Sequence, residues 1–189
     1  ASTGANSETR SYRAEWRWSY RLWQSLTATQ RDQISADYLL FGFLPANNRL
    51  TLDYNTVTTL NAVITPRLRI DVTHNARFQP SGNYGPIDRT GAEYFSRADE
   101  NRNLTLSTQI GYTPIPGISL NLQSDYFAND RNGTRNGQVV PQRRSRSLNF
   151  SGGANLNLAL GPKGRLTGDI RRTYRDDRAI VFQVGVPQP

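Results

Sequence analysis

The chain has no cysteine, no methionine, one histidine and one lysine among its 189 residues. Without cysteine it has no disulfide framework, no thiolate metal site and no cysteine nucleophile. It also lacks any run of about eighteen uncharged apolar residues, so no segment is suited to cross a membrane as a helix. Mean hydropathy is −0.64 and only 36% of the residues are hydrophobic, which is low for a globular domain with an ordinary core.

The apolar residues that are present recur with a period of two. From Ser11 to Leu22, aromatic and aliphatic residues occupy the even positions, and Ser, Arg and Glu occupy the odd ones. An extended strand places these two sets on opposite faces, whereas helical spacing would mix them around the axis. We therefore predict a strand here, with one apolar face and one polar face.

The same alternation continues along most of the chain. It predicts further strands at 34–40, 49–64, 67–78, 103–112, 118–126, 147–158, 165–174 and 180–186. The expected fold is all-β, with eight or nine strands and no helix. Residues 1–10 are interpreted as a polar lead-in of the kind left by signal cleavage, and residues 11–186 as one antiparallel sheet.

The predicted connections alternate between two kinds. Thr65-Pro66, 113–117 and 161–164 are short and rich in proline or glycine, which is typical of tight turns. Residues 79–101 and 129–146 are long and polar, and we expect them to form long loops. In an antiparallel meander, this order places all short turns at one end of the sheet and all long loops at the other.

The net charge of +8 comes from 22 arginines and one lysine against 15 acidic residues. The arginines alternate with apolar residues inside the predicted strands, often with an acid on the same face. This pattern indicates ion pairing within a polar interior rather than a nucleic-acid surface. The charges expected on that face are Arg13, Glu15, Arg17, Asp53, Arg69, Asp71, Asp125, Asp169 and Arg171.

One class of proteins shares three features with this chain. They are strands of ten residues or more, aromatics near the ends of apolar stretches, and turns and loops at opposite ends of the sheet. In these features residues 11–186 resemble bacterial outer-membrane β-barrel proteins. The resemblance implies an antiparallel up-and-down transmembrane β-barrel of about 8–9 strands, or a segment of a larger barrel. The expected lipid-facing or girdle aromatics are Tyr12, Trp16, Trp18, Tyr20, Phe78, Tyr112, Tyr126 and Tyr174.

This architecture implies a location in the outer membrane of a Gram-negative envelope, among lipid and lipopolysaccharide. The expected function is that of a porin-like transport or secretion pore component, or of a scaffold that binds other envelope protein subunits. The alternative is a soluble secreted β-sheet adhesin or filament subunit, since a soluble sheet also alternates. Arg143, Arg144 and Arg146 form the densest basic cluster, suited either to anionic lipid phosphates or to plain solvation.

An enzymatic site is not expected. His74 is the only histidine, its even number places it on the apolar face, and Ala76 stands where a partner serine would be needed. With one histidine and no cysteine, neither a zinc site nor a cofactor is expected. The transported cargo, the oligomeric state and the completeness of the barrel are not encoded in any motif.

Overall fold

The computed structural model describes residues 7–42, 47–86, 93–135, 138–160 and 164–182. Nearly all of them belong to eight long strands. The strands are β1 (Ser7–Trp23), β2 (Leu26–Phe41), β3 (Arg49–Thr65), β4 (Leu68–Pro86), β5 (Glu93–Ile115), β6 (Ile118–Arg135), β7 (Gln138–Ala159) and β8 (Arg165–Val181). Among these described residues there is no helix long and apolar enough to cross a membrane.

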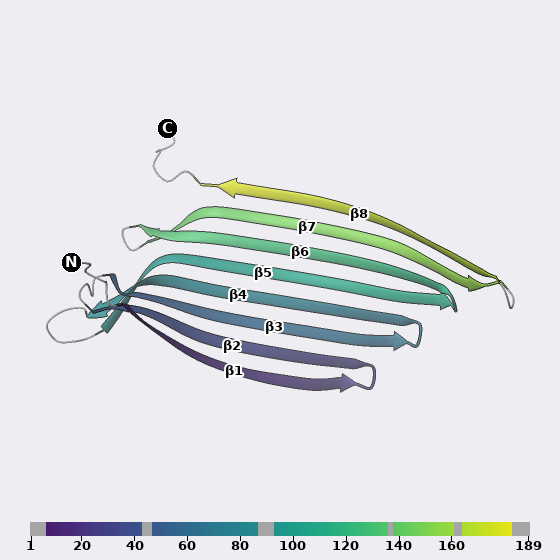
Figure 1. The fold of residues 1–189 in the computed structure, drawn as a ribbon, viewed down its shortest axis with the longest axis horizontal. Coiled ribbons are helices and arrows are strands. Elements are labelled where there is room, and N and C mark those ends of the chain that lie inside the picture. Colours follow the sequence, from purple (N-terminus) through teal and green to yellow (C-terminus); the bar gives the residue numbers. More distant parts are fainter. Residues whose placement is uncertain (1–6, 43–46, 87–92, 136–137, 161–163, 183–189) are drawn as a thin grey trace, which may run out of the picture.

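Each strand pairs antiparallel with the next strand in the sequence, which gives one sheet in the order β1 to β8. The predicted all-β, up-and-down meander is therefore confirmed. Figure 1 shows the sheet as a single layer with β1 and β8 on opposite edges. Within the described part of the chain, each edge strand has one partner only, so the sheet is open and is not closed into a barrel.

The two ends of the sheet are referred to below by their connections. The turn end carries the connections at 24–25, 66–67, 116–117 and 160–164, and the loop end carries those at 42–48, 87–92 and 136–137. β1 starts and β8 finishes at the loop end, on the left in Figure 1. The connections predicted as short turns therefore lie at one end and those predicted as loops at the other, but the loop-end connections are much shorter than predicted.

Successive strands are staggered toward the turn end. The row of paired residues that begins at Trp23, the last residue of β1, runs through Leu26, Ala62, Ile70, Ile110, Leu122 and Gly152 to Arg172 of β8. β8 extends seven residues beyond that row, to Arg165, after seven strand-to-strand steps. One residue per step is about 3.3 Å along the strands for each 4.8 Å across them, a slope of about 35°. In Figure 1 the strand ends step outward accordingly at the turn end.

The two predicted long loops are wrong. β4 and β5 remain paired as far as Pro86 and Glu93, and β6 and β7 as far as Arg135 and Gln138, so 79–101 and 129–146 are largely strand. Alternation is missing from these extensions because both of their faces carry mostly polar residues. Backbone pairing does not depend on that alternation.

Two boundaries also differ from the prediction. Ser7 to Arg10 are not a lead-in, because they pair with β2; residues 1–6 lie outside the described residues. The segments predicted at 165–174 and 180–186 belong, as far as Val181, to the single strand β8. Residues 183–186 lie outside the described residues.

The β5–β6 turn depends on Gly117, which has φ of +85°. A Cβ at this position would clash with the backbone oxygen of Asn157, and the Gly117 carbonyl accepts a hydrogen bond of 2.6 Å from the Asn157 amide. We expect Gly117→Ala to destabilise the protein by about 1–2 kcal/mol because a side chain is strained in this conformation. Equilibrium unfolding of the variant beside the parent protein measures this; Gly168→Ala, where a Cβ meets nothing within 4 Å, is the matched control.

Candidate functional site

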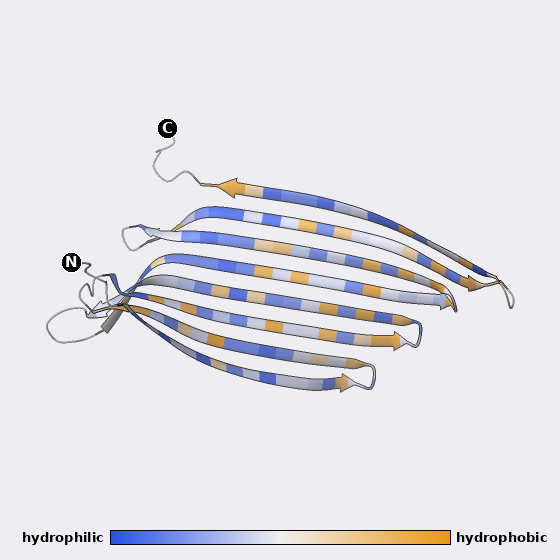
Figure 2. Cartoon of the chain, viewed as in Figure 1, coloured by the Kyte–Doolittle hydropathy of each residue, from blue (hydrophilic) through white to orange (hydrophobic). Residues whose placement is uncertain are grey.

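Between the bulges next to the turns and those near the loop end, the register keeps even-numbered residues opposite even-numbered ones. Trp16, for example, lies in one row with Asp32, Thr56, Ala76 and Leu104. The sheet therefore has an even-numbered face, here called the apolar face, and an odd-numbered face, here called the polar face. Figure 2 shows the resulting alternation of hydrophobic and hydrophilic residues along the strands.

A carboxylate with three arginines lies on the polar face of β1 and β2. Glu15 forms ion pairs with Arg13 at 3.2 Å, Arg17 at 3.0 Å and Arg31 at 2.7 Å. Arg13 also donates a 2.7 Å hydrogen bond to Gln33. The sequence identified the three residues of β1 but missed Arg31, whose odd number in β2 was the available signal.

The other predicted charges of the polar face are paired to different extents. Asp53 is 8% exposed and accepts two hydrogen bonds from Arg77, which the sequence analysis did not select. Arg69 and Asp71 form an ion pair of 2.8 Å. Asp125 accepts hydrogen bonds from Ser107 and Gln123.

Asp169 and Arg171 of β8 differ from the charges on the inner strands. They line a shallow hollow on the polar face, with Gln109, Asn121 and Asn155 among its other walls. Within the described part of the chain, neither residue forms an ion pair with another side chain. These two predicted polar-face charges thus stand next to the open edge without a charged partner.

Most of the large side chains of the apolar face are partly or largely exposed. Among the described residues, only Leu50 and Ala128 are buried hydrophobic side chains, and the single sheet provides no second layer to cover the rest. The exposed large side chains include Tyr12, Trp18, Tyr20 and Tyr174, each about half exposed or more. The described residues therefore do not form a hydrophobic core among themselves.

The apolar residues of this face form a band that runs diagonally across the sheet, except in β2 and β3, where they continue toward the loop end as far as Leu40 and Leu50. In β1 the band extends from Tyr12 to Leu22, and in β7 from Leu148 to Leu158. Leu148, however, lies in the same row of paired residues as Trp18, in the middle of the β1 stretch. The band has moved six residues in six strand-to-strand steps, which is the same rate as the stagger of the strands.

Aromatic side chains follow the loop-end border of this diagonal band. At that border, or one position inside it, lie Tyr12, Phe78, Tyr126, Phe150 and Tyr174, whereas Tyr54 of β3 has Leu50 and Leu52 beyond it toward the loop end. Tyr20 and Tyr112 lie at the opposite border, near the turn end. Trp16 and Trp18 lie between the borders, within the band rather than at its edge. Six strands, β1 and β4 to β8, thus carry an aromatic residue at or near one border of the band or the other.

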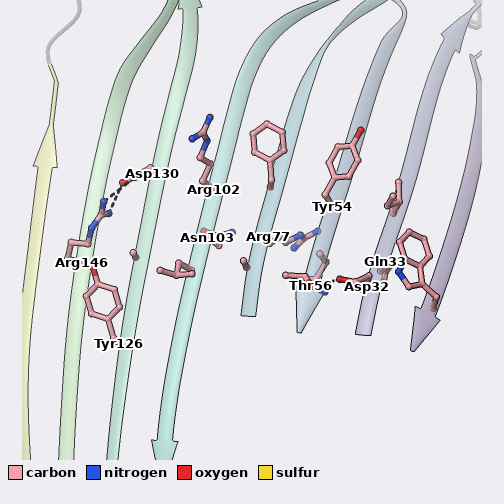
Figure 3. Close-up of a pocket in the computed structure, with 17 residues that line it drawn as sticks. Asp32, Gln33, Tyr54, Thr56, Arg77, Arg102, Asn103, Tyr126, Asp130 and Arg146 are labelled. Carbon is pink, nitrogen blue, oxygen red and sulfur yellow. Dashed lines mark hydrogen bonds and ion pairs between the residues drawn. The ribbon is translucent and has the colours of Figure 1, made fainter. Parts of the chain in front are cut away.

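A diagonal line of polar residues runs along the middle of the band, from β2 to β8. It consists of Asp32, Thr56, Thr58, His74, Thr108, Ser124 and Arg172. Asp32 lies in a depression of about 790 Å³ and accepts hydrogen bonds from Thr56 and, at 2.9 and 3.1 Å, from Gln30. Figure 3 shows Thr56 and Asp32 joined on neighbouring strands. Hydrogen bonding of this carboxylate lowers the cost of its position among apolar side chains.

Beyond the aromatic border, toward the loop end, β5 to β8 carry charges on the same face. Arg146 forms a bidentate pair with Asp130, at 2.6 and 3.0 Å, which Figure 3 marks with dashed lines. The guanidinium of Arg144 lies 5.5 Å from the ring centroid of Phe182. Arg102 stacks over Phe78 at 5.3 Å. We call this group the charged belt.

The basic cluster lies within a strand and not at the end of the loop predicted at 129–146. Arg143, Arg144 and Arg146 lie inside β7. Arg144 and Arg146 are on the apolar-face side within the charged belt, whereas Arg143 lines a hollow with Glu100 and Arg131. Because alternate residues of a strand point to opposite faces, the three arginines cannot act together as one patch.

The structure places His74, the only histidine of the sequence, in β4 on the apolar face. His74 lies opposite Thr58 of β3 and Leu106 of β5. No group of three histidine, cysteine or acidic side chains in the described ranges is placed to hold a metal ion. Comparisons of the chain with protein-family models, curated proteins and solved structures found no match.

Proposed function

We propose that this sheet forms part of the wall of a transmembrane β-barrel in a bacterial outer membrane, and that it serves as a component of a transport or secretion pore. The observation that carries the proposal is the diagonal apolar band. Barrel strands tilt by about 35–45° from the barrel axis, so a membrane perpendicular to that axis must meet each strand at a shifted position. The band shifts at about 35°.

The height of the band supports the same proposal. In β1 and in β7 the apolar stretch covers ten residue steps, which is about 27 Å measured along the axis of a barrel with this tilt. The apolar band of outer-membrane barrels is about 25 Å tall and is bordered by aromatic residues. A soluble sheet would need a second layer over its apolar face, and the described residues provide none.

The polar face would then line the interior. The pairs of Glu15 with three arginines and of Asp53 with Arg77 satisfy charges that face inward. The two open edges favour an arc of a larger barrel. An eight-stranded barrel is filled by its own side chains, whereas larger barrels enclose a channel. A passage lined by polar and charged groups is the basis for choosing a pore component over a scaffold.

The charged belt supports a location among anionic lipids. It lies just beyond the aromatic border, at the level where lipid headgroups would begin. Arg144 and Arg146 project from the same face there, and guanidinium groups bind phosphate oxygens with bidentate hydrogen bonds. We propose lipopolysaccharide phosphates as the contacts of these two arginines.

Site-directed spin labelling tests the proposal directly, because the parent chain contains no cysteine. Single cysteines placed along β3 to β7 in lipid vesicles should show high oxygen accessibility at even positions and high accessibility to a water-soluble nickel reagent at odd positions. In β7 the label deepest in the membrane should be at Ala154, near the centre of the apolar stretch. It should not be at Leu148, although Leu148 is in register with Trp18. A deepest label at Leu148, or a protein that dissolves without detergent with both faces in water, would overturn the proposal in favour of a soluble secreted sheet.

A further inference from the structure

The two edge strands present unpaired backbone along their whole length. β1 and β8 each contain 17 residues, and within the described chain each pairs on one side only. Long exposed edges are sites for strand addition, and unpaired backbone groups are especially costly within a membrane. Both edges of the proposed barrel wall therefore require a partner strand.

The stagger of the sheet determines the register in which β8 would meet another β1. The row of paired residues that starts at Tyr20 of β1 ends at Tyr174 of β8. Pairing of β8 with another β1 is the eighth strand-to-strand step, so a stagger of one residue per step shifts the pairing by eight residues along β1, from Tyr20 to Tyr12. Tyr174 would then lie opposite Tyr12 of the added strand. Both tyrosines belong to the aromatic border, so the border would continue without a break.

The charges of the two edge strands are complementary in this register. On the polar face, Asp169 meets Arg17 and Arg171 meets Glu15, and toward the loop end Asp176 meets Arg10 and Arg178 meets Glu8. One like-charged pair, Arg165 with Arg21, remains at the turn end. Asp169 and Arg171, which have no ion-pair partner in the described chain, thus both gain one.

The neighbouring registers lack this complementarity. A shift of one residue would exchange the two faces, so only even shifts are compatible with the apolar band. With Tyr174 opposite Ala14, Arg171 meets Arg17, Arg175 meets Arg13 and Arg178 meets Arg10. With Tyr174 opposite Arg10, three like pairs arise again: Asp169 with Glu15, Arg171 with Arg13 and Asp176 with Glu8. Neither register forms an opposite-charge pair.

We propose that β1 pairs with β8 of a second copy of this chain, with Tyr12 opposite the Tyr174 of that copy. Figure 1 shows β1 and β8 at opposite edges of an open sheet. Pairing them within one chain would require the whole layer to bend round, whereas two copies joined reciprocally satisfy all four edges in one closed ring. The inference rests on the proposed barrel and specifies what closes it.

Disulfide trapping between separately produced chains tests this pairing. Ser19→Cys in one chain and Thr167→Cys in another face each other in the proposed register, and neither chain has another cysteine. Oxidation of the mixed proteins in lipid vesicles should give a heterodimer. Ser19→Cys with Asp169→Cys, and Ser19→Cys with Arg165→Cys, represent the two neighbouring registers and should crosslink poorly.

The outcomes separate the possible closures. A double variant carrying both cysteines that crosslinks only within the monomer would show that the sheet closes on itself. No crosslink in any pair would show that other strands cover the edges, and either result overturns the proposal. The spin-label pattern on β3 to β6 does not depend on what covers the edges, so it tests the barrel separately.

A charge variant provides a second measurement. Asp169→Arg removes an attraction to Arg17 of the partner copy and replaces it with a repulsion, without breaking an ion pair in the described chain. Cross-strand charge pairs contribute up to about 1 kcal/mol, so trapping of the Ser19–Thr167 pair should slow by about two- to five-fold. An unchanged rate would contradict the proposed register.

Discussion

Val72→Arg is expected to lower the free energy of unfolding in lipid vesicles by about 2–4 kcal/mol, the cost of an arginine at the middle of a barrel's lipid-facing surface. Val72 lies on the apolar face of β4, between Leu60 of β3 and Thr108 of β5. It is near the centre of the diagonal band, too far from either border for an arginine to reach water easily. Urea unfolding in vesicles, followed by tryptophan fluorescence, measures the loss.

The adjacent residue provides the matched control. Thr73→Arg introduces the same side chain on the same strand, but on the polar face, opposite Thr59 and Ser107. It should change stability by less than about 1 kcal/mol, since surface substitutions away from special features usually have small effects. Equal losses in the two variants would contradict the assignment of the faces to lipid and interior.

The double substitution Arg97→Ala and Arg102→Ala is expected to cost about 2–4 kcal/mol, because it leaves a buried carboxylate without a countercharge. The Glu100 side chain is 1% exposed. Its oxygens bind Arg97 at 2.7 Å, Arg102, and Asn132 at 3.3 Å. The two arginines are about half exposed, so we place the effect below that of a fully buried pair. Hydrogen exchange should rise most in the β4–β5 and β6–β7 extensions.

Removing the charge should recover part of that loss. Glu100→Gln keeps the size of the side chain and its bond with Asn132, but needs no arginine. Adding it to the double variant should restore about half of the lost stability, whereas Glu100→Gln alone should weaken the two arginine contacts. If the triple variant is no more stable than the double variant, the uncompensated carboxylate is not the cause.

The alternation of residues was sufficient to predict most of the fold. In strands such as β1, β3 and β7, even-numbered Leu, Ile, Val and aromatic residues alternate with odd-numbered polar ones, and the structure places these sets on two faces. Tight turns such as Thr65-Pro66 and Pro116-Gly117 were readable because proline and glycine fix backbone dihedrals locally. These features depend on neighbouring residues in the chain, so the sequence alone determines them.

Pairing between distant residues was not readable in the same way. Arg31 and Arg77, the partners of Glu15 and Asp53, lie 16 and 24 residues away from them. The polar strand extensions around Glu100 and Arg146 resembled loops, because their side chains meet polar surroundings on both faces and carry no periodic signal. Their strand state is decided by backbone pairing with a neighbouring strand.

The sequence by itself determined which residues share a face, because side chains of a strand alternate wherever the strand lies. Only the tertiary structure decided how each strand slides against the next, and that sliding turns separate apolar stretches into one diagonal band. It also leaves two open edges whose charges match in one register. Register depends on contacts between strands remote in sequence, and no single strand contains that information.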